Sequence, residues 1–304
     1  MKFVNSETHK LCISEKIENS FDSWRIQMSV IISTLNQKGG VGKTTNTLNV
    51  AVQLARNGAK VLMIDMDVNQ GSLTKSILGD ISEDGGLGIM NLLATPVSLQ
   101  ECIYETKVDN LFIVPSEEKI NGMELNIEHV LFSKPAPQTI LRDKLSCPLA
   151  EQFDYIMIDN GPNLNQVTIN SLVASDYFLV SFTPADMSID GMKKLFHASQ
   201  AIMSTLNSNL KLLGIVLCMV DKREKISKEC RENLTAMVGD FVFNTEISVN
   251  ARFKTLRRGM NSIFDVAKIG KKRHARNSKS AKQYEELAFE IVERIAANDI
   301  ETQV

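Results

Sequence analysis

The stretch from Asn36 to Asn49 reads NQKGGVGKTTNTLN and contains residues suited to binding a phosphate chain. Successive N–H groups of a glycine-rich turn can point at one anion, and the N-terminus of a following helix adds partial positive charge. Lys43 would neutralise phosphate charge, and the hydroxyl of Thr44 suits Mg²⁺. The consensus phosphate loop has glycine at the position of Gln37, so the pattern fails at one residue, while GGVGKTT is complete.

The same loop carries a second lysine, Lys38, five residues before Lys43. One phosphate chain needs one such lysine, so Lys38 requires another explanation. A lysine placed where charge builds up on a transferring phosphoryl group would stabilise that charge, in the manner of an arginine finger. The alternative is a solvated loop lysine without a role in chemistry.

Three aspartates end apolar runs elsewhere in the chain. Asp65 and Asp67 lie in VLMIDMD, and Asp159 closes YIMID. Ligands of open α/β sheets gather at the carboxyl ends of the strands, so these acids are candidates for a ligand-binding site. Taken alone, each could equally be a polar residue that merely ends a strand.

The elements that must position these residues alternate between strands and helices. Residues 43–57 and 187–205 have apolar residues at three- and four-residue spacing, which is typical of helices. Nearly continuous apolar runs are typical of parallel strands covered on both faces. Such alternation predicts an α/β fold with a doubly wound, mostly parallel sheet flanked by helices. The predicted strands are residues 30–35, 61–65, 111–115, 155–159, 177–183 and 212–220.

Composition limits the classes of protein. The chain has 304 residues, of which 43% are apolar and 23% charged, as in ordinary globular proteins. It contains no apolar run of about 18 residues, and residues 1–27 lack the apolar core of a secretory signal, so we expect a cytoplasmic protein. The five cysteines form no CxxC pair, and we expect them reduced and mostly buried. We divide the chain into an appendage, residues 1–27, and one domain, residues 28–304.

Charge is distributed unevenly along the chain. Residues 251–282 contain eleven Lys or Arg and one acid, Asp265, so this basic segment has a net charge of +10. Because the whole chain has a net charge of −2, the remainder has −12. A concentrated positive patch indicates a polyanionic partner, although a solvated face would explain it too.

The sequence KGGVGKTT, with Lys38 ahead of the glycines, resembles the deviant Walker A motif of the ParA/MinD group of P-loop ATPases, and Gln37 is common among its ParA/Soj members. The resemblance implies a P-loop NTPase fold with ATP and Mg²⁺ as cofactors. It also implies a homodimer in the ATP state, in which Lys38 reaches the phosphates bound by the partner subunit. The residues that the motif assigns to ATP are Lys38, Gly39, Gly40, Val41, Gly42, Lys43, Thr44 and Thr45.

The resemblance extends to the carboxylates. The catalytic set that it implies is Lys38, Lys43 and Asp67, with Asp67 orienting the attacking water. The metal set that it implies is Thr44, Asp65 and Asp159, the last as the Walker B aspartate. This chain has one residue more than the usual D-P-Q-G after Asp67, and one proline where D-x-P-P is typical after Asp159. Two later residues, Met219 and Asp221, match the neighbours of the adenine base.

In ParA proteins, basic residues near the C-terminus bind nonspecific DNA in the ATP dimer. The matching residues lie in the basic segment and are Arg252, Arg257, Arg258, Lys271, Lys272, Arg273 and Arg276. The resemblance thus implies a partition ATPase that associates with the nucleoid. Its slow hydrolysis would be stimulated by a ParB-like centromere-binding protein.

Two other classes of function remain open. A MinD-like factor that positions a membrane or protein cargo would end in a basic amphipathic helix, whereas residues 285–304 carry six acids and one arginine, so we expect no membrane partner. A metabolic enzyme on the same fold, such as an iron–sulfur reductase or an amidoligase, would need cluster cysteines or a small-molecule pocket. The isolated cysteines give no such match.

Overall fold

The structure, a computed structural model, describes residues 29–79, 86–117, 126–186, 189–250, 262–264 and 279–302, without the side chains of 186, 189–192 and 301–302. The appendage predicted at residues 1–27 lies outside these ranges, as does most of the basic segment. The predicted division into an appendage and one domain therefore stays a prediction.

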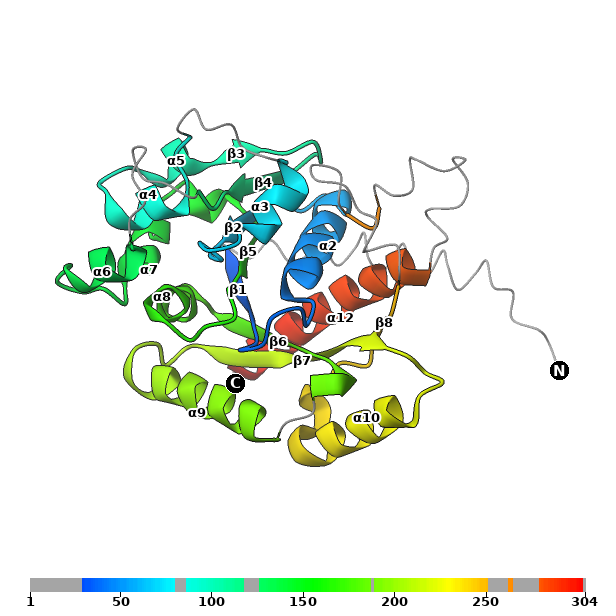
Figure 1. The fold of residues 1–304 in the computed structure, drawn as a ribbon. Helices are drawn as coiled ribbons and strands as arrows, with labels where there is room; N and C mark the ends of the chain where they lie inside the picture. Colours follow the sequence, from blue (N-terminus) through cyan, green and yellow to red (C-terminus); the bar gives the residue numbers. More distant parts are fainter. Residues whose placement is uncertain are drawn as a thin grey trace.

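One sheet of eight strands runs through the described part of the chain, in the order β3-β4-β2-β5-β1-β6-β7-β8 (Figure 1). Every neighbouring pair is parallel except β3 and β4, so the predicted mostly parallel sheet is confirmed. The strands are β1 (Val30–Leu35), β2 (Val61–Asp65), β3 (Tyr104–Glu105), β4 (Leu111–Val114), β5 (Tyr155–Asp159), β6 (Tyr177–Phe182), β7 (Lys211–Val220) and β8 (Ile247–Ser248).

Helices cover both faces of the sheet (Figure 1). The long C-terminal helix lies against the helix that follows the glycine-rich loop. The helices are α2 (Lys43–Arg56), α3 (Ser72–Ile77), α4 (Ile89–Ala94), α5 (Leu99–Cys102), α6 (Ile127–Phe132), α7 (Ile140–Leu145), α8 (Gln166–Ala174), α9 (Ile189–Thr205), α10 (Lys225–Val238) and α12 (Lys279–Thr302).

Alternate residues of the central strands face opposite sides of the sheet. In β2, Val61 and Met63 are buried in the apolar cluster that contains α2 and α12. Leu62 and Ile64 are buried on the other face, in the cluster formed with α4 to α7. A strand covered on both faces needs an apolar residue at every position, which explains the uninterrupted run in this sequence. On the same second face, α8, α9 and α10 cover β6 and β7.

The order of the strands brings the candidate residues together. The strands β2, β5 and β1 are consecutive neighbours in the sheet, so their carboxyl ends meet at one edge. In the register, Asp159 of β5 pairs with Asp65 on one side and with Thr34 of β1 on the other. The glycine-rich loop leaves the same edge after Leu35. Residues that are more than a hundred positions apart in the sequence therefore form one site.

Candidate functional site

The glycine-rich loop has the backbone of a phosphate cradle. Gly40 and Gly42 have positive φ angles of 76° and 96°, which side chains other than glycine rarely adopt. At position 42 a Cβ atom would also lie 3.5 Å from the Sγ atom of Cys218. The helix α2 begins at the next residue, with Asn46 N donating to Gly42 O over 2.8 Å. The positive end of a 14-residue helix thus faces the loop, as anion binding requires.

The two lysines of the loop differ in their surroundings. Lys43 is buried, and its Nζ donates to the backbone oxygen of Lys38 over 3.1 Å. Burial lowers the pKa of Lys43, and the charges of Asp159 and Asp67 oppose this effect. The Lys38 residue is exposed, with its own N–H held by Asn36 Oδ1 at 3.0 Å. One lysine therefore faces the carboxylates inside the site, while the other lies on its surface.

Asp159 is the buried carboxylate that best fits a metal ion. It is fully buried, and neither of its oxygens has a hydrogen-bond partner among the described residues. Burial, and next the charge of Asp65, raise its pKa well above the usual value, while the nearby Thr44 hydroxyl and Lys43 oppose the rise. An unpartnered buried carboxylate beside a threonine hydroxyl fits Mg²⁺, which binds few protein oxygens and keeps nucleotide oxygens and waters as its other ligands.

Asp65 has a different environment at the end of the neighbouring strand. Its Oδ2 accepts hydrogen bonds from the N and Oγ1 atoms of Thr74 at 2.8 and 2.7 Å, and its Oδ1 accepts one from Asp67 N at 3.1 Å. Burial raises its pKa to about 6, against the effect of these donors. Both oxygens of Asp65 are thus engaged by protein donors, in contrast to those of Asp159.

Asp67 lies over the turn that follows Asp159. A Cβ atom at Gly161 would lie 3.3 Å from Asp67 Oδ1, a tight contact, so a larger residue there would press on this carboxylate. The additional residue after Asp67 is accommodated in a helical turn, closed by Gly71 N donating to Asp67 O over 2.8 Å. The unusual length of this loop therefore leaves Asp67 at the site.

Sequence analysis did not identify the polar residues that support the loop. Asn160 is buried directly after Asp159, and its Oδ1 has no partner in the described part of the chain. Asn46 donates to Ser181 Oγ over 2.9 Å and to Cys218 Sγ over 3.1 Å, and it accepts from the buried hydroxyl of Tyr284 over 3.0 Å. Of these residues, only Asn160 carries a signal in the sequence, its position after a strand-end aspartate.

The two residues predicted beside the adenine base lie at the end of β7. Met219 is 46% exposed and has a positive φ of 54°, at an irregularity in the pairing of β7 with β8. Asp221 pairs with Arg223 at 2.6 Å, and these bonds lower its pKa to about 2. The exposed thioether of Met219 is compatible with contact to the adenine ring, and the charged carboxylate of Asp221 with contact to its polar edge. The role of both residues stays a prediction.

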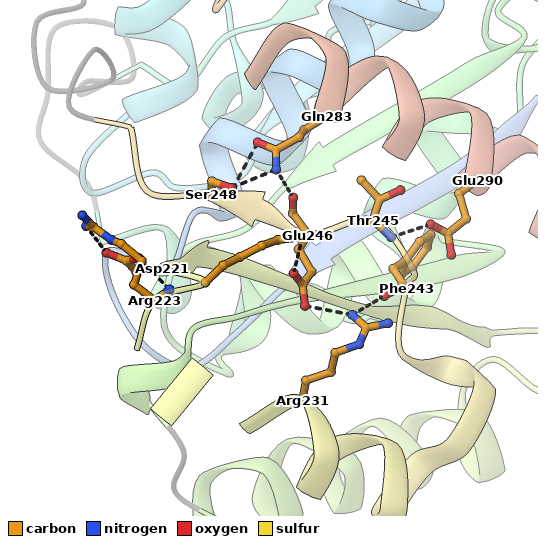
Figure 2. A network of polar contacts seen from close by, with 10 residues as sticks. Asp221, Arg223, Arg231, Phe243, Thr245, Glu246, Ser248, Gln283 and Glu290 are labelled. Carbon is orange, nitrogen blue, oxygen red and sulfur yellow. Dashed lines mark hydrogen bonds and ion pairs between the residues drawn. The ribbon is translucent and has the colours of Figure 1, made fainter. Parts of the chain in front are cut away.

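A network of polar contacts joins this end of the sheet to α10 and α12 (Figure 2). Glu246, just before β8, binds Arg231 of α10 over 3.0 Å and Lys222 over 3.6 Å. Gln283 of α12 donates to Glu246 O and to Ser248 Oγ, over 2.6 and 3.0 Å. These contacts therefore link α10, the segment just before β8 and α12.

The residues predicted to bind DNA lie outside the described part of the chain. These residues are Arg252, Arg257, Arg258, Lys271, Lys272, Arg273 and Arg276. Of the basic segment, the structure describes residues 262–264 and 279–282. Ser262 and Ile263 are buried, so the middle of the segment packs against the domain. Among the described helices, none is both long enough and apolar enough to cross a membrane.

Comparison with known proteins identifies relatives that cover most of this chain. A family model described as an AAA domain matches residues 29–212. The chain is similar to the chromosome-partitioning ATPase Soj of Treponema pallidum, at 30% identity over 86% of this chain and 96% of the relative. It is 34% identical to the chromosome partitioning protein ParA of Myxococcus xanthus, over 73% of this chain and 76% of the relative. Among solved structures, a cobyrinic acid a,c-diamide synthase from Mycobacterium smegmatis, with a bound ATP analogue and magnesium, has a similar fold. Its TM-score is 0.69 at 24% identity, over 86% of this chain and 93% of that one.

Proposed function

The chain belongs to the ParA/MinD family of P-loop ATPases, and from that premise we propose that it is a DNA partition ATPase. It binds ATP and Mg²⁺, forms an ATP-sandwich homodimer and binds nonspecific DNA in that state. Hydrolysis is slow until a ParB-like centromere-binding protein stimulates it. In the cell the ATP form associates with the nucleoid in the cytoplasm.

The pair of lysines on one loop is the observation that carries this proposal. Lys43 is buried beside two carboxylates, where it can neutralise the phosphates of its own ATP. Lys38 is exposed on the same loop, where a second subunit can meet it. A cation added from the partner stabilises charge on the transferred phosphoryl group, so hydrolysis depends on dimer formation.

Within one subunit, we assign roles to the other residues of the site from their surroundings. Bound Mg²⁺ would be held by Thr44 and Asp159 and would screen the charge of the phosphates. The N–H groups from Gly39 to Thr45 hold the phosphate chain, and Asp67 orients the attacking water. Asp65, the third residue of the predicted metal set, supports this arrangement from the neighbouring strand, because both of its oxygens already accept hydrogen bonds from the protein.

Binding of DNA rests on charge. Eleven Lys or Arg against one acid in residues 251–282 can neutralise several phosphates, a mode of binding that needs no base contacts and weakens steeply with salt. The relatives named Soj and ParA, each at least 30% identical, are partitioning proteins by name, which supports this reading.

Two alternatives make different predictions. A MinD-like protein needs a C-terminal helix that is free to bind lipid, whereas α12 places apolar residues such as Tyr284, Leu287 and Ile291 in the core. An amide-forming enzyme shares the fold, as the likeness to the synthase illustrates, so the fold does not choose between these classes. The two loop lysines are shared by the whole ParA/MinD group, so the basic segment and the packing of α12 in the core are what favour the partition ATPase over a MinD-like protein.

The test is binding of purified protein to random-sequence duplex DNA with ATP, with ADP and without nucleotide, across a series of salt concentrations. We expect binding that requires ATP and weakens with salt. A variant with reversed charges at Lys271, Lys272, Arg273 and Arg276 should lose it and keep ATP binding. Absence of DNA binding in every nucleotide state would overturn the proposal and direct attention to another cargo or a small substrate.

A further inference from the structure

Four buried residues form a closed ring of hydrogen bonds beside the site. Asp65 Oδ2 accepts from Thr74 Oγ1 at 2.7 Å, and Thr74 Oγ1 accepts from Ser116 N at 2.8 Å. Ser116 Oγ donates to Asp67 O over 3.3 Å, and Asp67 N donates to Asp65 Oδ1 over 3.1 Å, which closes the ring. Each of the four residues is at most 7% exposed. The ring joins β2, α3 and the end of β4.

The direction of these hydrogen bonds is fixed. The backbone N–H of Ser116 can only donate, so Thr74 Oγ1 must accept there and direct its own proton to Asp65. Thr74 N also donates to Asp65, which makes this carboxylate an acceptor of three bonds. A buried ring with each donor and acceptor matched has one arrangement, which specifies the positions of its members.

The ring includes the backbone N–H and C=O groups of Asp67, the residue that we assign to orienting the attacking water. The carbonyl oxygen of Asp67 accepts from Ser116 Oγ and from Gly71 N, and its N–H is held by Asp65. The ring fixes the backbone on both sides of Asp67, and Gln70 N donates to Asp67 Oδ1 over 3.3 Å, so the carboxylate lies over Gly161, near Asp159 and Lys43. The loop has one residue more than the usual D-P-Q-G, and these bonds hold Asp67 in place.

We propose that Thr74 and Ser116 are positioning residues for ATP hydrolysis, because their ring fixes the peptide of Asp67 and thereby the direction of its carboxylate. The proposal rests on the role given to Asp67 under the proposed function. Thr74 and Ser116 both lie outside the glycine-rich loop and act through Asp67. A small displacement of a group that orients the reactants has a large effect on rate and a small one on binding.

The test compares ATP affinity with turnover in the full chain. For Thr74→Val, which keeps the shape of the side chain, we expect kcat for phosphate release to fall about tenfold or more, while the Kd for ATP with Mg²⁺ stays within about twofold. Thr74→Ser retains the hydroxyl and should restore turnover. Ser116→Ala removes only the donor to Asp67 and should have a smaller effect. Thr95→Val is the matched control, since among the described residues the Thr95 hydroxyl bonds only to Asn91 O, over 2.8 Å, at the end of α4.

A double-mutant cycle separates positioning from a general loss of stability. If Thr74 acts through Asp67, Thr74→Val should lower kcat little further in an Asp67→Asn background. Equal losses in both backgrounds, a parallel loss of ATP affinity, or wild-type turnover of Thr74→Val would overturn the proposal. If instead Asp67→Asn alone turns over normally, the role of Asp67 in the proposed function fails, and this outcome is distinct from failure of the ring.

Discussion

Asn49 Oδ1 accepts a hydrogen bond from the backbone N–H of Ile263 over 2.7 Å, although the two residues are 214 positions apart. Asn49 is fully buried on α2, and its Nδ2 donates to Thr45 O over 2.7 Å. Seven residues further along α2, the guanidinium of Arg56 lies 4.8 Å from the centre of the Phe264 ring. The middle of the basic segment is therefore attached to the helix that begins at the phosphate loop.

This attachment predicts the effect of Asn49→Leu. The change removes the acceptor and leaves the buried N–H of Ile263 unpaired, a cost of about 1–3 kcal/mol. We expect the unfolding temperature to fall by about 2 °C or more in a thermal scan. If the basic segment binds DNA, DNA affinity in the ATP state should fall more than ATP affinity. Gln53→Leu is the matched control, because the Gln53 amide nitrogen bonds to Asn57 at the end of its own helix. Equal effects of both changes would contradict the prediction.

Removing the buried lysine should prevent nucleotide binding. Lys43→Ala takes away the one cation that faces both Asp159 and Asp67 in the described site, so the phosphates would meet uncompensated carboxylates. We expect ATP affinity to fall about a hundredfold or more by calorimetry. The control is Lys225→Ala, an exposed lysine of α10 that pairs with Glu229. Tight ATP binding by Lys43→Ala would remove this residue from the site.

The exposed lysine should behave differently. Lys38→Ala leaves Lys43 and the glycine turn in place, so ATP binding should persist while dimer formation and phosphate release are lost. Light scattering with ATP and a phosphate-release assay measure the two effects. A mixture of Lys38→Ala with Lys43→Ala should recover part of the turnover, because each mixed dimer contains one site with both lysines. No recovery, or normal turnover of Lys38→Ala alone, would refute a role between subunits.

The sequence predicts the sheet and the phosphate loop better than it predicts the contacts around them. The loop and Asp159 follow strong apolar strands, so local pattern suffices to place them at one edge. Thr74 lies on α3, which follows Asp65 closely in the sequence, but Ser116 reaches Thr74 only because β4 packs beside β2, which no local pattern reveals. The strands β3 and β8 are too short, at two residues each, to produce a periodic signal.

The buried acids predict how the metal-free protein responds to pH. Burial raises the pKa of Asp65 to about 6 and that of Asp159 well above its usual value. The folded chain therefore retains protons that the unfolded chain has already released, so stability should decrease as pH rises from about 4 through 6 and towards the pKa of Asp159. In EDTA, the unfolding temperature should be lower near about pH 7.5 than near about pH 5.

Asp159→Asn tests which carboxylate causes the decrease in stability as pH rises. An amide has about the same shape and no charge to bury, so the variant should unfold about 2 °C or more above the wild type near pH 7.5 and show a weaker dependence on pH. It should also lose the stabilisation that Mg²⁺-ATP gives the wild type, since the proposed metal ligand is gone. Asp143→Asn, at an exposed aspartate of α7, serves as the control. An unchanged or lower unfolding temperature would mean that the Asp159 carboxylate is already compensated in the folded chain, and the case for a metal ion beside it would be lost.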